Sequence, residues 1–142
     1  MGLIMKVLYQ TQASATGGRG GRVTSSDGTL DTQLAIPKEL GGPGGAFPNP
    51  EMLFAAGYAA CFDNALAFAA SSRKVRPGKT RVDASVSLGQ REEGGFALSV
   101  RLVVSIPDLP REQAEALLEA AHQVCPYSNA IRGNVPVDIV LI

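Results

Sequence analysis

Residues 49–72, NPEMLFAAGYAACFDNALAFAASS, decide the fold of this chain. Asn49 can cap the N-terminus of a helix with its side chain, and Pro50 suits the first helical position because its missing N–H would have no partner there. Glu51 is an acid in the first turn, where the helix dipole favours negative charge. Residues 52–70 are then apolar nearly all the way round. A helix that is apolar on every side has to be buried, so the stretch predicts a central core helix.

A membrane span is the alternative for a helix of this composition. The stretch owes its length to alanine rather than to leucine or isoleucine, and Asp63 and Asn64 stand near its middle. Polar side chains at that depth are costly in lipid. We therefore expect a helix buried in protein, and no membrane contact.

Gly57 and Cys61 are the two unusual residues of this helix. Glycine inside a helix costs about 1 kcal/mol relative to alanine, and Gly57 stands one turn before Cys61 on the same face. The sulfur of Cys61 is therefore expected to lie over a bare patch of backbone. Such a gap either lets a second helix approach closely or leaves room for a small molecule beside the thiol.

The size and charge of the chain limit its class. Its 142 residues are enough for one domain, residues 1–142, with a sizeable core. Lys and Arg total 13 and Asp and Glu total 13, so no net field attracts nucleic acid or anionic lipid. Two cysteines and no signal peptide are typical of a cytoplasmic protein, in which a cysteine pair is more often catalytic than structural.

Hydrophobic periodicity and turn residues predict an α+β fold around the central helix. The chain should open with a meander, in which Asp27-Gly28 makes a hairpin turn. The expected strands cover residues 4–9, 11–26 (interrupted at the glycines 17–21), 30–36, 82–88, 96–106 and 137–141. The expected helical segments are a single turn over 37–40 and a second helix over 110–124 with one buried face, which includes Val124; residues 127–133 are expected to be a loop.

A thiol in an apolar helix should have a raised pKa, because burial disfavours the thiolate. A reactive Cys61 therefore needs a nearby cation, and the candidate is Arg19 in the glycine-rich loop GGRGG. At about 4 Å and an effective dielectric constant near 20, a cation would favour the thiolate by roughly 4 kcal/mol. A solvated turn and an RGG-type nucleic-acid contact are the alternatives for this loop, although a single copy without net positive charge argues against nucleic acid.

Glu51 is the natural carboxylate to hold Arg19 through a bidentate ion pair. Ten residues separate Glu51 from Cys61, which corresponds to about 15 Å along a helix. Either Arg19 spans this distance, or two copies of the helix pack so that Arg19 and Glu51 of one chain meet Cys61 of the other. A simple first-turn acid is the other interpretation of Glu51.

Cys125 ends the predicted second helix, because Pro126 prevents regular continuation. Both cysteines could be no more than small buried hydrophobic residues. His122 and Cys125 have the spacing of two metal ligands, but no further ligands of matching spacing accompany them. No phosphate loop or dinucleotide fingerprint occurs either, so we expect neither a metal nor a cofactor.

Three segments carry a resemblance to a known family: TGGRGGR at 16–22, NPEMLFAAGYAACFDNAL at 49–66 and HQVCPYSNAIRGN at 122–134. Together they are similar to the OsmC/Ohr family, and most closely to its organic hydroperoxide resistance branch. The resemblance covers essentially residues 5–142. It implies an α+β, OsmC-like fold in an intertwined homodimer, with central apolar helices wrapped by antiparallel sheets and active sites at the subunit interface.

The resemblance also implies an activity. Cys61 would be the peroxidatic and Cys125 the resolving cysteine of a thiol-dependent peroxidase, with Arg19 and Glu51 activating the thiolate and a dithiol such as a lipoylated protein as reductant. The substrates would be alkyl, aryl or fatty-acid hydroperoxides, favoured by an apolar pocket. The residues expected to form this pocket are Phe47, Phe54, Tyr58 and Phe62. An OsmC-branch peroxidase of broader specificity and a non-catalytic structural dimer are the alternatives.

Overall fold

The predicted central helix is present as α1, Pro50–Arg73, in a computed structural model that describes residues 5–142. Pro50 occupies its first position and Glu51 its first turn. The side that carries Tyr58, Phe62 and Leu66 has no exposed surface. The opposite side is open in the single chain, since Met52 is 57% and Phe68 is 61% exposed.

By length and composition α1 is also able to cross a membrane. Core helices of soluble proteins share these properties, and one side of α1 packs into a protein core. Asp63, near its middle, accepts a hydrogen bond from the Thr80 hydroxyl. The expectation of no membrane contact stays a prediction.

The chain forms two compact units, Met1–Pro50 and Glu51–Ile142. The first contains an antiparallel sheet of three strands in the order β1-β2-β3. Its elements are β1 (Ala13–Thr16), η1 (Gly18–Gly20, a 3-10 turn), β2 (Arg22–Ser25), β3 (Asp31–Gln33) and η2 (Lys38–Leu40). That the two units form a single domain stays a prediction.

The sequence indicated that the glycines at 17–21 interrupt a strand. In the structure they also let the chain reverse between β1 and β2. Gly17 has a φ of 77°, and a Cβ at Gly21 would lie 1.7 Å from the carbonyl oxygen of Thr16. Only glycine fits such a close approach. The predicted hairpin turn at Asp27-Gly28 is confirmed, because the Gly28 N–H donates to the Ser25 carbonyl at 2.9 Å between β2 and β3.

The predicted strand over 4–9 is wrong for residues 5–9, which form neither helix nor strand; residue 4 lies outside the described part. Val7, Leu8 and Tyr9 are 65%, 88% and 81% exposed. Strands need a neighbouring edge for their backbone hydrogen bonds, and the single chain supplies none to this segment in its sheets.

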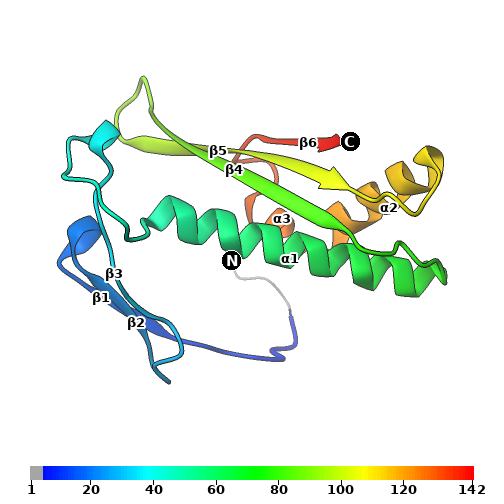
Figure 1. Cartoon of the computed structure of the whole chain (residues 1–142), viewed down its shortest axis with the longest axis horizontal. Helices are drawn as coiled ribbons and strands as arrows, with labels where there is room; N and C mark the ends of the chain where they lie inside the picture. Colours follow the sequence, from blue (N-terminus) through cyan, green and yellow to red (C-terminus); the bar gives the residue numbers. More distant parts are fainter. Residues whose placement is uncertain (1–4) are drawn as a thin grey trace. The chain divides into compact units, whose positions relative to one another are not determined.

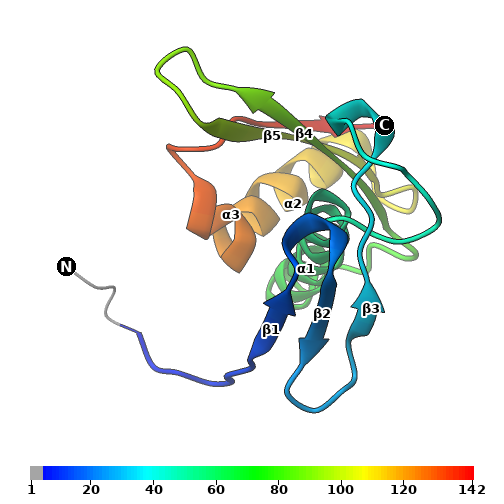
Figure 2. The same ribbon diagram turned by 90° about the vertical axis from the view of Figure 1, so that its left-hand side faces the viewer.

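The second unit places a three-stranded sheet on one side of three helices (Figures 1 and 2). The strands are β4 (Arg81–Gln90), β5 (Phe96–Ser105) and β6 (Val137–Leu141), and the helices beside α1 are α2 (Arg111–Val124) and α3 (Pro126–Ile131). The strands predicted over 82–88 and 96–106 are confirmed as β4 and β5, which pair antiparallel as a hairpin. β6 runs parallel to β5 rather than antiparallel, because the chain crosses over through α2 and α3 before it returns to the sheet.

The core of this unit lies between the sheet and the helices. Leu102 and Val104 of β5 are fully buried, and so is Ala121 of α2, while Leu117 of α2 is 1% exposed. These residues form one cluster with the buried side of α1. The helix α1 therefore shares one core with the sheet and with α2, the helix that leads directly to Cys125.

Two sequence predictions near Cys125 are wrong. The segment predicted as a loop begins with α3, because Pro126 stops α2 and then serves as the first residue of a new helix. Val124, expected on the buried face of α2, is 43% exposed. The last residue before a helix break leaves the regular packing of that helix, and here its side chain faces a cavity.

Candidate functional site

The fold brings the two cysteines together. Cys61 lies in the middle of α1 and Cys125 at the junction of α2 and α3, and their sulfur atoms are 3.7 Å apart. Cys125 is fully buried, whereas Cys61 is partly exposed. Both are free thiols separated by 64 positions in the sequence, so their proximity is a product of tertiary structure.

The α2–α3 junction fixes Cys125. Its backbone is extended, with φ −67° and ψ 120°, between two helical segments. The Cys125 N–H still donates to Ala121 of α2, and its carbonyl accepts from the Asn129 N–H of α3, both at 2.9 Å. Cys125 thus belongs to both helices, and the proline that follows keeps it at the corner between them.

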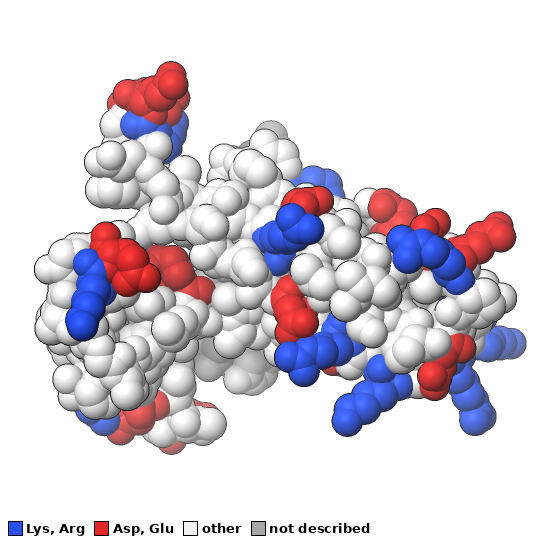
Figure 3. Space-filling model, turned by 45° about the horizontal axis from the view of Figure 1, so that its top comes forward, with Lys and Arg blue, Asp and Glu red and all other residues white. Residues whose placement is uncertain are grey.

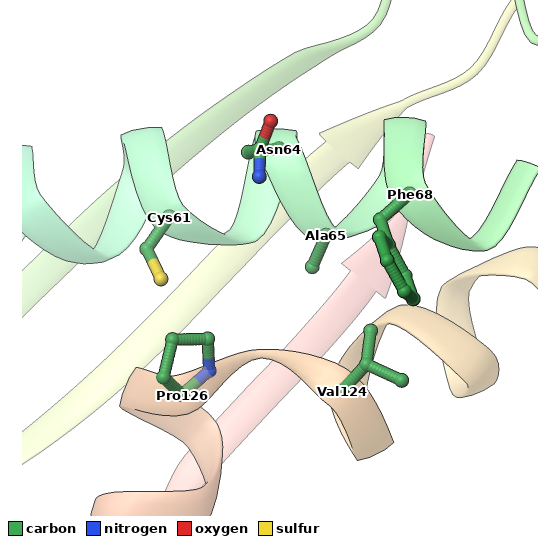
Figure 4. Close-up of a pocket in the computed structure, with 6 residues that line it drawn as sticks. All are labelled: Cys61, Asn64, Ala65, Phe68, Val124 and Pro126. Carbon is green, nitrogen blue, oxygen red and sulfur yellow. The ribbon is translucent and has the colours of Figure 1, made fainter. Parts of the chain in front are cut away.

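A cavity of about 480 Å³ opens beside the thiols (Figure 4). The Cys61 side chain points toward it from α1, and Pro126 and Val124 face it from the α2–α3 junction. Ala65 and Phe68 continue the apolar lining along α1, and Asn64 adds one polar side chain. A small apolar molecule with a polar end could reach Cys61 here, but not the buried Cys125.

The electrostatics of Cys61 agree with the expectation from sequence. Burial raises the pKa of this thiol, and the neighbouring Cys125 raises it further. The backbone N–H of Tyr127, which bonds to the sulfur, acts in the opposite direction. One peptide N–H leaves the pKa raised, so a reactive thiolate requires additional positive charge.

The gap over Gly57 is filled by a side chain of another helix, Tyr127 of α3, in agreement with the first of the two interpretations that the sequence left open. A Cβ at this position would lie 2.6 Å from the hydroxyl oxygen of Tyr127. The absence of a side chain at Gly57 therefore lets the Tyr127 ring lie against α1, next to Cys61. Tyr127 is a site residue that the sequence did not indicate, because its role depends on this contact with a distant part of the chain.

A second polar group that the sequence did not indicate lies behind the thiols. The Ser128 side chain is fully buried and shares a hydrogen bond of 2.6 Å with the Tyr58 hydroxyl and one of 2.9 Å with Nδ1 of His122. Arg132 donates to the His122 carbonyl at 2.6 Å. His122 is thus engaged with Ser128, and among residues 5–142 no group of three or more His, Cys, Asp or Glu is placed to hold a metal ion.

The other predicted site residues are distributed over both units. Arg19 lies in η1 and Phe47 in the loop before α1, both in the first unit, and Phe47 is 45% exposed. Glu51 lies in the first turn of α1, three turns before Cys61. Their roles at the site stay predictions.

The remaining aromatic residues form a cluster along α1. The Tyr58 ring lies 6.4 Å from those of both Phe54 and Phe62, and 5.8 Å from Tyr127. Tyr58 and Phe62 have no exposed surface and do not line the cavity beside Cys61. Their helical spacing points them into the core, whereas Asn64 and Phe68 follow Cys61 along the open side of the helix and Ala65 lies at the border between that side and the core.

The fold and this pair of thiols define a class of α+β proteins with a cysteine pair against a central helix, and known proteins share the fold. The family model described as OsmC-like protein matches residues 42–140. The organic hydroperoxide resistance protein of Xanthomonas axonopodis pv. citri is 51% identical over 137 residues, 96% of this chain and 96% of that protein. OhrB of Bacillus subtilis is 46% identical over 137 residues, 94% of this chain and 98% of that protein.

A solved structure agrees with these relatives. The crystal structure of an organic hydroperoxide resistance protein from Legionella pneumophila superposes with a TM-score of 0.92 at 51% identity, over 96% of this chain and 98% of that one. The chain therefore belongs to the OsmC/Ohr family.

Proposed function

We propose that this chain is a thiol-dependent peroxidase that reduces organic hydroperoxides to alcohols and protects the cell against organic peroxide stress. The observation that carries the proposal is the 3.7 Å contact between a partly exposed and a buried thiol beside an apolar cavity. The names of the relatives from Xanthomonas and Bacillus support the substrate class. We place the activity in the cytoplasm, where a reduced thiol pair can be maintained.

The reaction has two steps. The Cys61 thiolate attacks the terminal oxygen of a hydroperoxide, so that a sulfur–oxygen bond forms, the oxygen–oxygen bond breaks and the alkoxide leaves as the alcohol after it takes up a proton. Cys61 is then a sulfenic acid. Cys125 attacks its sulfur, a disulfide forms, and the oxygen leaves as water. An external dithiol, such as a lipoylated protein, restores the two thiols and becomes a disulfide itself.

The exposure of the thiols supports the order of these steps. A peroxide can reach Cys61 from the cavity, whereas Cys125 has no exposed surface. The lining of the cavity favours an alkyl, aryl or fatty-acid chain over water-like hydrogen peroxide, since apolar surface gains free energy when it leaves water.

Arg19 and Glu51 complete the site in this proposal. The raised pKa of Cys61 calls for a cation, and the arginine of the glycine-rich turn would supply it while Glu51 fixes the guanidinium through a bidentate pair. We also propose that the protein works as a homodimer, in which a second copy covers the open side of α1. The exposed Met52 and Phe68 support this assembly.

The experiment follows peroxide consumption by the purified protein with a dithiol reductant. Cys61→Ser should abolish turnover, whereas Cys125→Ser should permit one oxidation and then stall. Mass spectrometry after one equivalent of cumene hydroperoxide should find oxidised Cys61 in the Cys125→Ser protein. Equal loss of the first oxidation in both variants would contradict the assigned roles, and no consumption by the wild-type protein would favour a structural dimer.

A further inference from the structure

Two neighbouring contacts connect α1 to the α2–α3 junction. The contact between the two cysteines is one of them. Tyr58 precedes Cys61 by three positions on α1, and Ser128 follows Cys125 by three positions on α3. Residues three apart lie on the same face of a helix. The 2.6 Å hydrogen bond between Tyr58 and Ser128 therefore runs beside the 3.7 Å contact between Cys61 and Cys125.

Ser128 also connects this contact to α2. His122 precedes Cys125 by three positions, and its Nδ1 lies 2.9 Å from the same Ser128 oxygen. One buried hydroxyl thus joins α1, α2 and α3 around Cys125. None of these three side chains lines the cavity beside Cys61, so none is placed to touch a peroxide.

The hydrogen bond is suited to hold a fixed geometry. Tyr58 and Ser128 both have no exposed surface, so water does not compete for the hydroxyl groups. Burial raises the pKa of Tyr58, so its hydroxyl keeps its proton throughout the range in which thiols react. The ring of Tyr58 is fixed in turn by Phe54, Phe62 and Tyr127.

We propose that the Tyr58–Ser128 hydrogen bond positions Cys125 against Cys61 and so sets how readily the two sulfurs form a disulfide. The proposal rests on the proposed function for its place in a catalytic cycle. To form the bond, the sulfur atoms must approach from 3.7 Å to about 2.05 Å. The Tyr58–Ser128 hydrogen bond, called the clamp below, lies one turn from each cysteine on α1 and α3 and keeps the two sulfurs close together. Disulfide formation then behaves as a well-oriented intramolecular reaction.

Two variants test this role. Tyr58→Phe removes one hydroxyl and leaves the ring, and Ser128→Ala removes the shared oxygen. The first readout is the equilibrium between dithiol and disulfide forms of the protein in defined mixtures of reduced and oxidised dithiothreitol. The second readout is the rate at which the Cys61 sulfenic acid disappears after one equivalent of cumene hydroperoxide.

Tyr58→Phe should shift the equilibrium toward the dithiol by about three- to tenfold, the effect expected from one net hydrogen bond. Ser128→Ala should shift it by at least as much, because it removes the bonds to both Tyr58 and His122. The sulfenic acid should persist longer by a similar factor in Ser128→Ala, while the rate of Cys61 oxidation stays within twofold of the wild type. In the double variant the shift should not exceed that of Ser128→Ala, since both changes break the same bond.

Thr80→Val is the matched control. It also removes a hydroxyl bonded to α1, through Asp63, but this bond has no connection to α2 or α3. Its dithiol–disulfide equilibrium should match that of the wild type. A shift as large as in Tyr58→Phe would mean that any loosening of α1 has the same effect, and would overturn the specific role of the clamp.

The outcomes separate this inference from the proposed function. The equilibrium with dithiothreitol does not require peroxidase activity, so it tests the clamp even if the wild type consumes no peroxide. Wild-type behaviour of Tyr58→Phe, with its fold intact by circular dichroism, would overturn the inference and leave the peroxidase proposal in place. If Ser128→Ala does not fold, Tyr58→Phe decides the question by itself.

Discussion

Cys61 is the residue whose chemistry depends most on its surroundings. Burial and the second thiol both raise its pKa, and the Tyr127 N–H only partly opposes them. The opposing effect of a guanidinium at contact distance is roughly 4 kcal/mol, about three pKa units. The proposed effect of the Arg19 charge is therefore large enough to decide whether Cys61 is a thiol or a thiolate at neutral pH.

Replacement of Arg19 tests this balance. Arg19→Ala is expected to raise the pKa of Cys61 toward or above the reference value of about 8.5, and Arg19→Lys should restore it only in part, because lysine lacks the planar fork that engages a carboxylate. The pH dependence of Cys61 alkylation measures the pKa directly. An unchanged pKa in Arg19→Ala, in a folded protein, would mean that another group activates the thiol.

Glu51→Ala is the companion variant. It removes the carboxylate but leaves the cation, so it should change the pKa of Cys61 less than Arg19→Ala does. Turnover should fall by more than the changed pKa of Cys61 explains. The control is an assay above the Cys61 pKa, where a defect in positioning persists and a defect in ionisation disappears.

Gly57 is the residue that gives Tyr127 its place. Gly57→Ala should gain about 1 kcal/mol in helix propensity and lose about 1–3 kcal/mol through overpacking against the Tyr127 hydroxyl, 2.6 Å from the new Cβ. We expect a net loss of up to about 2 kcal/mol in urea unfolding. The same change in a Tyr127→Phe background should cost less, because the closest atom is gone; an equal cost in both backgrounds would contradict this contact.

At the scale of elements, the α2–α3 junction carries a pH dependence through His122. Burial lowers the pKa of His122, Arg132 lowers it further, and Glu119 opposes both. In the unfolded chain His122 takes up a proton near pH 6.5, at about the reference pKa. In the folded chain it does so only at lower pH. Protonation therefore favours the unfolded state, so stability falls as the pH drops from about 6.5 toward the lowered pKa of His122.

His122→Gln isolates this contribution, because glutamine can still bond to Ser128 but does not titrate. Between pH 7.5 and pH 5.5 the melting temperature of the wild type should fall further than that of the variant. Carboxylates contribute equally to both proteins, so the difference reports His122 alone. Identical falls in the two proteins would show that its proton uptake is not coupled to folding.

The sequence predicted elements wherever the local pattern and the tertiary contacts agree. The caps of α1, the alternation in β4 and β5 and the apolar face of α2 each identify an element by themselves. α3 is not predictable from sequence, because a six-residue helix has too few turns for a hydrophobic period and its proline also marks the end of α2. Residues 5–9 are mostly apolar, as in a strand, but belong to neither sheet of the described residues 5–142.

The candidate site was predictable to the same extent. The two cysteines could be named from sequence, and the structure brings their sulfurs together. The supporting residues Tyr127 and Ser128 could not, since their roles depend on a contact with α1 across about 70 positions of sequence. Tyr58 and Phe62 lie in the core and do not line the cavity beside Cys61, because aromatic residues indicate burial before they indicate a ligand. Their place in a substrate pocket stays a prediction.

For the whole molecule, the exposed side of α1 leads to a prediction about assembly. Phe68 and Met52 on α1 and Leu8 in the N-terminal segment leave large apolar side chains in solvent, and a second copy would cover them. Sedimentation should find a homodimer and no folded monomer at micromolar concentration. A stable, fully active monomer would contradict both the dimer and a site shared between subunits.

The separation of the two thiols along the chain has a consequence for the lifetime of the protein. A disulfide between Cys61 and Cys125 closes a loop of 64 residues that contains β4, β5 and α2. Such a loop lowers the conformational entropy of the unfolded chain and so raises the free energy of unfolding by about 4 kcal/mol. Cellular proteases act on opened chains. In the proposed cycle peroxide, by oxidising the pair, would therefore protect this chain from degradation, and the reductant that restores the thiols would make it accessible to proteases again.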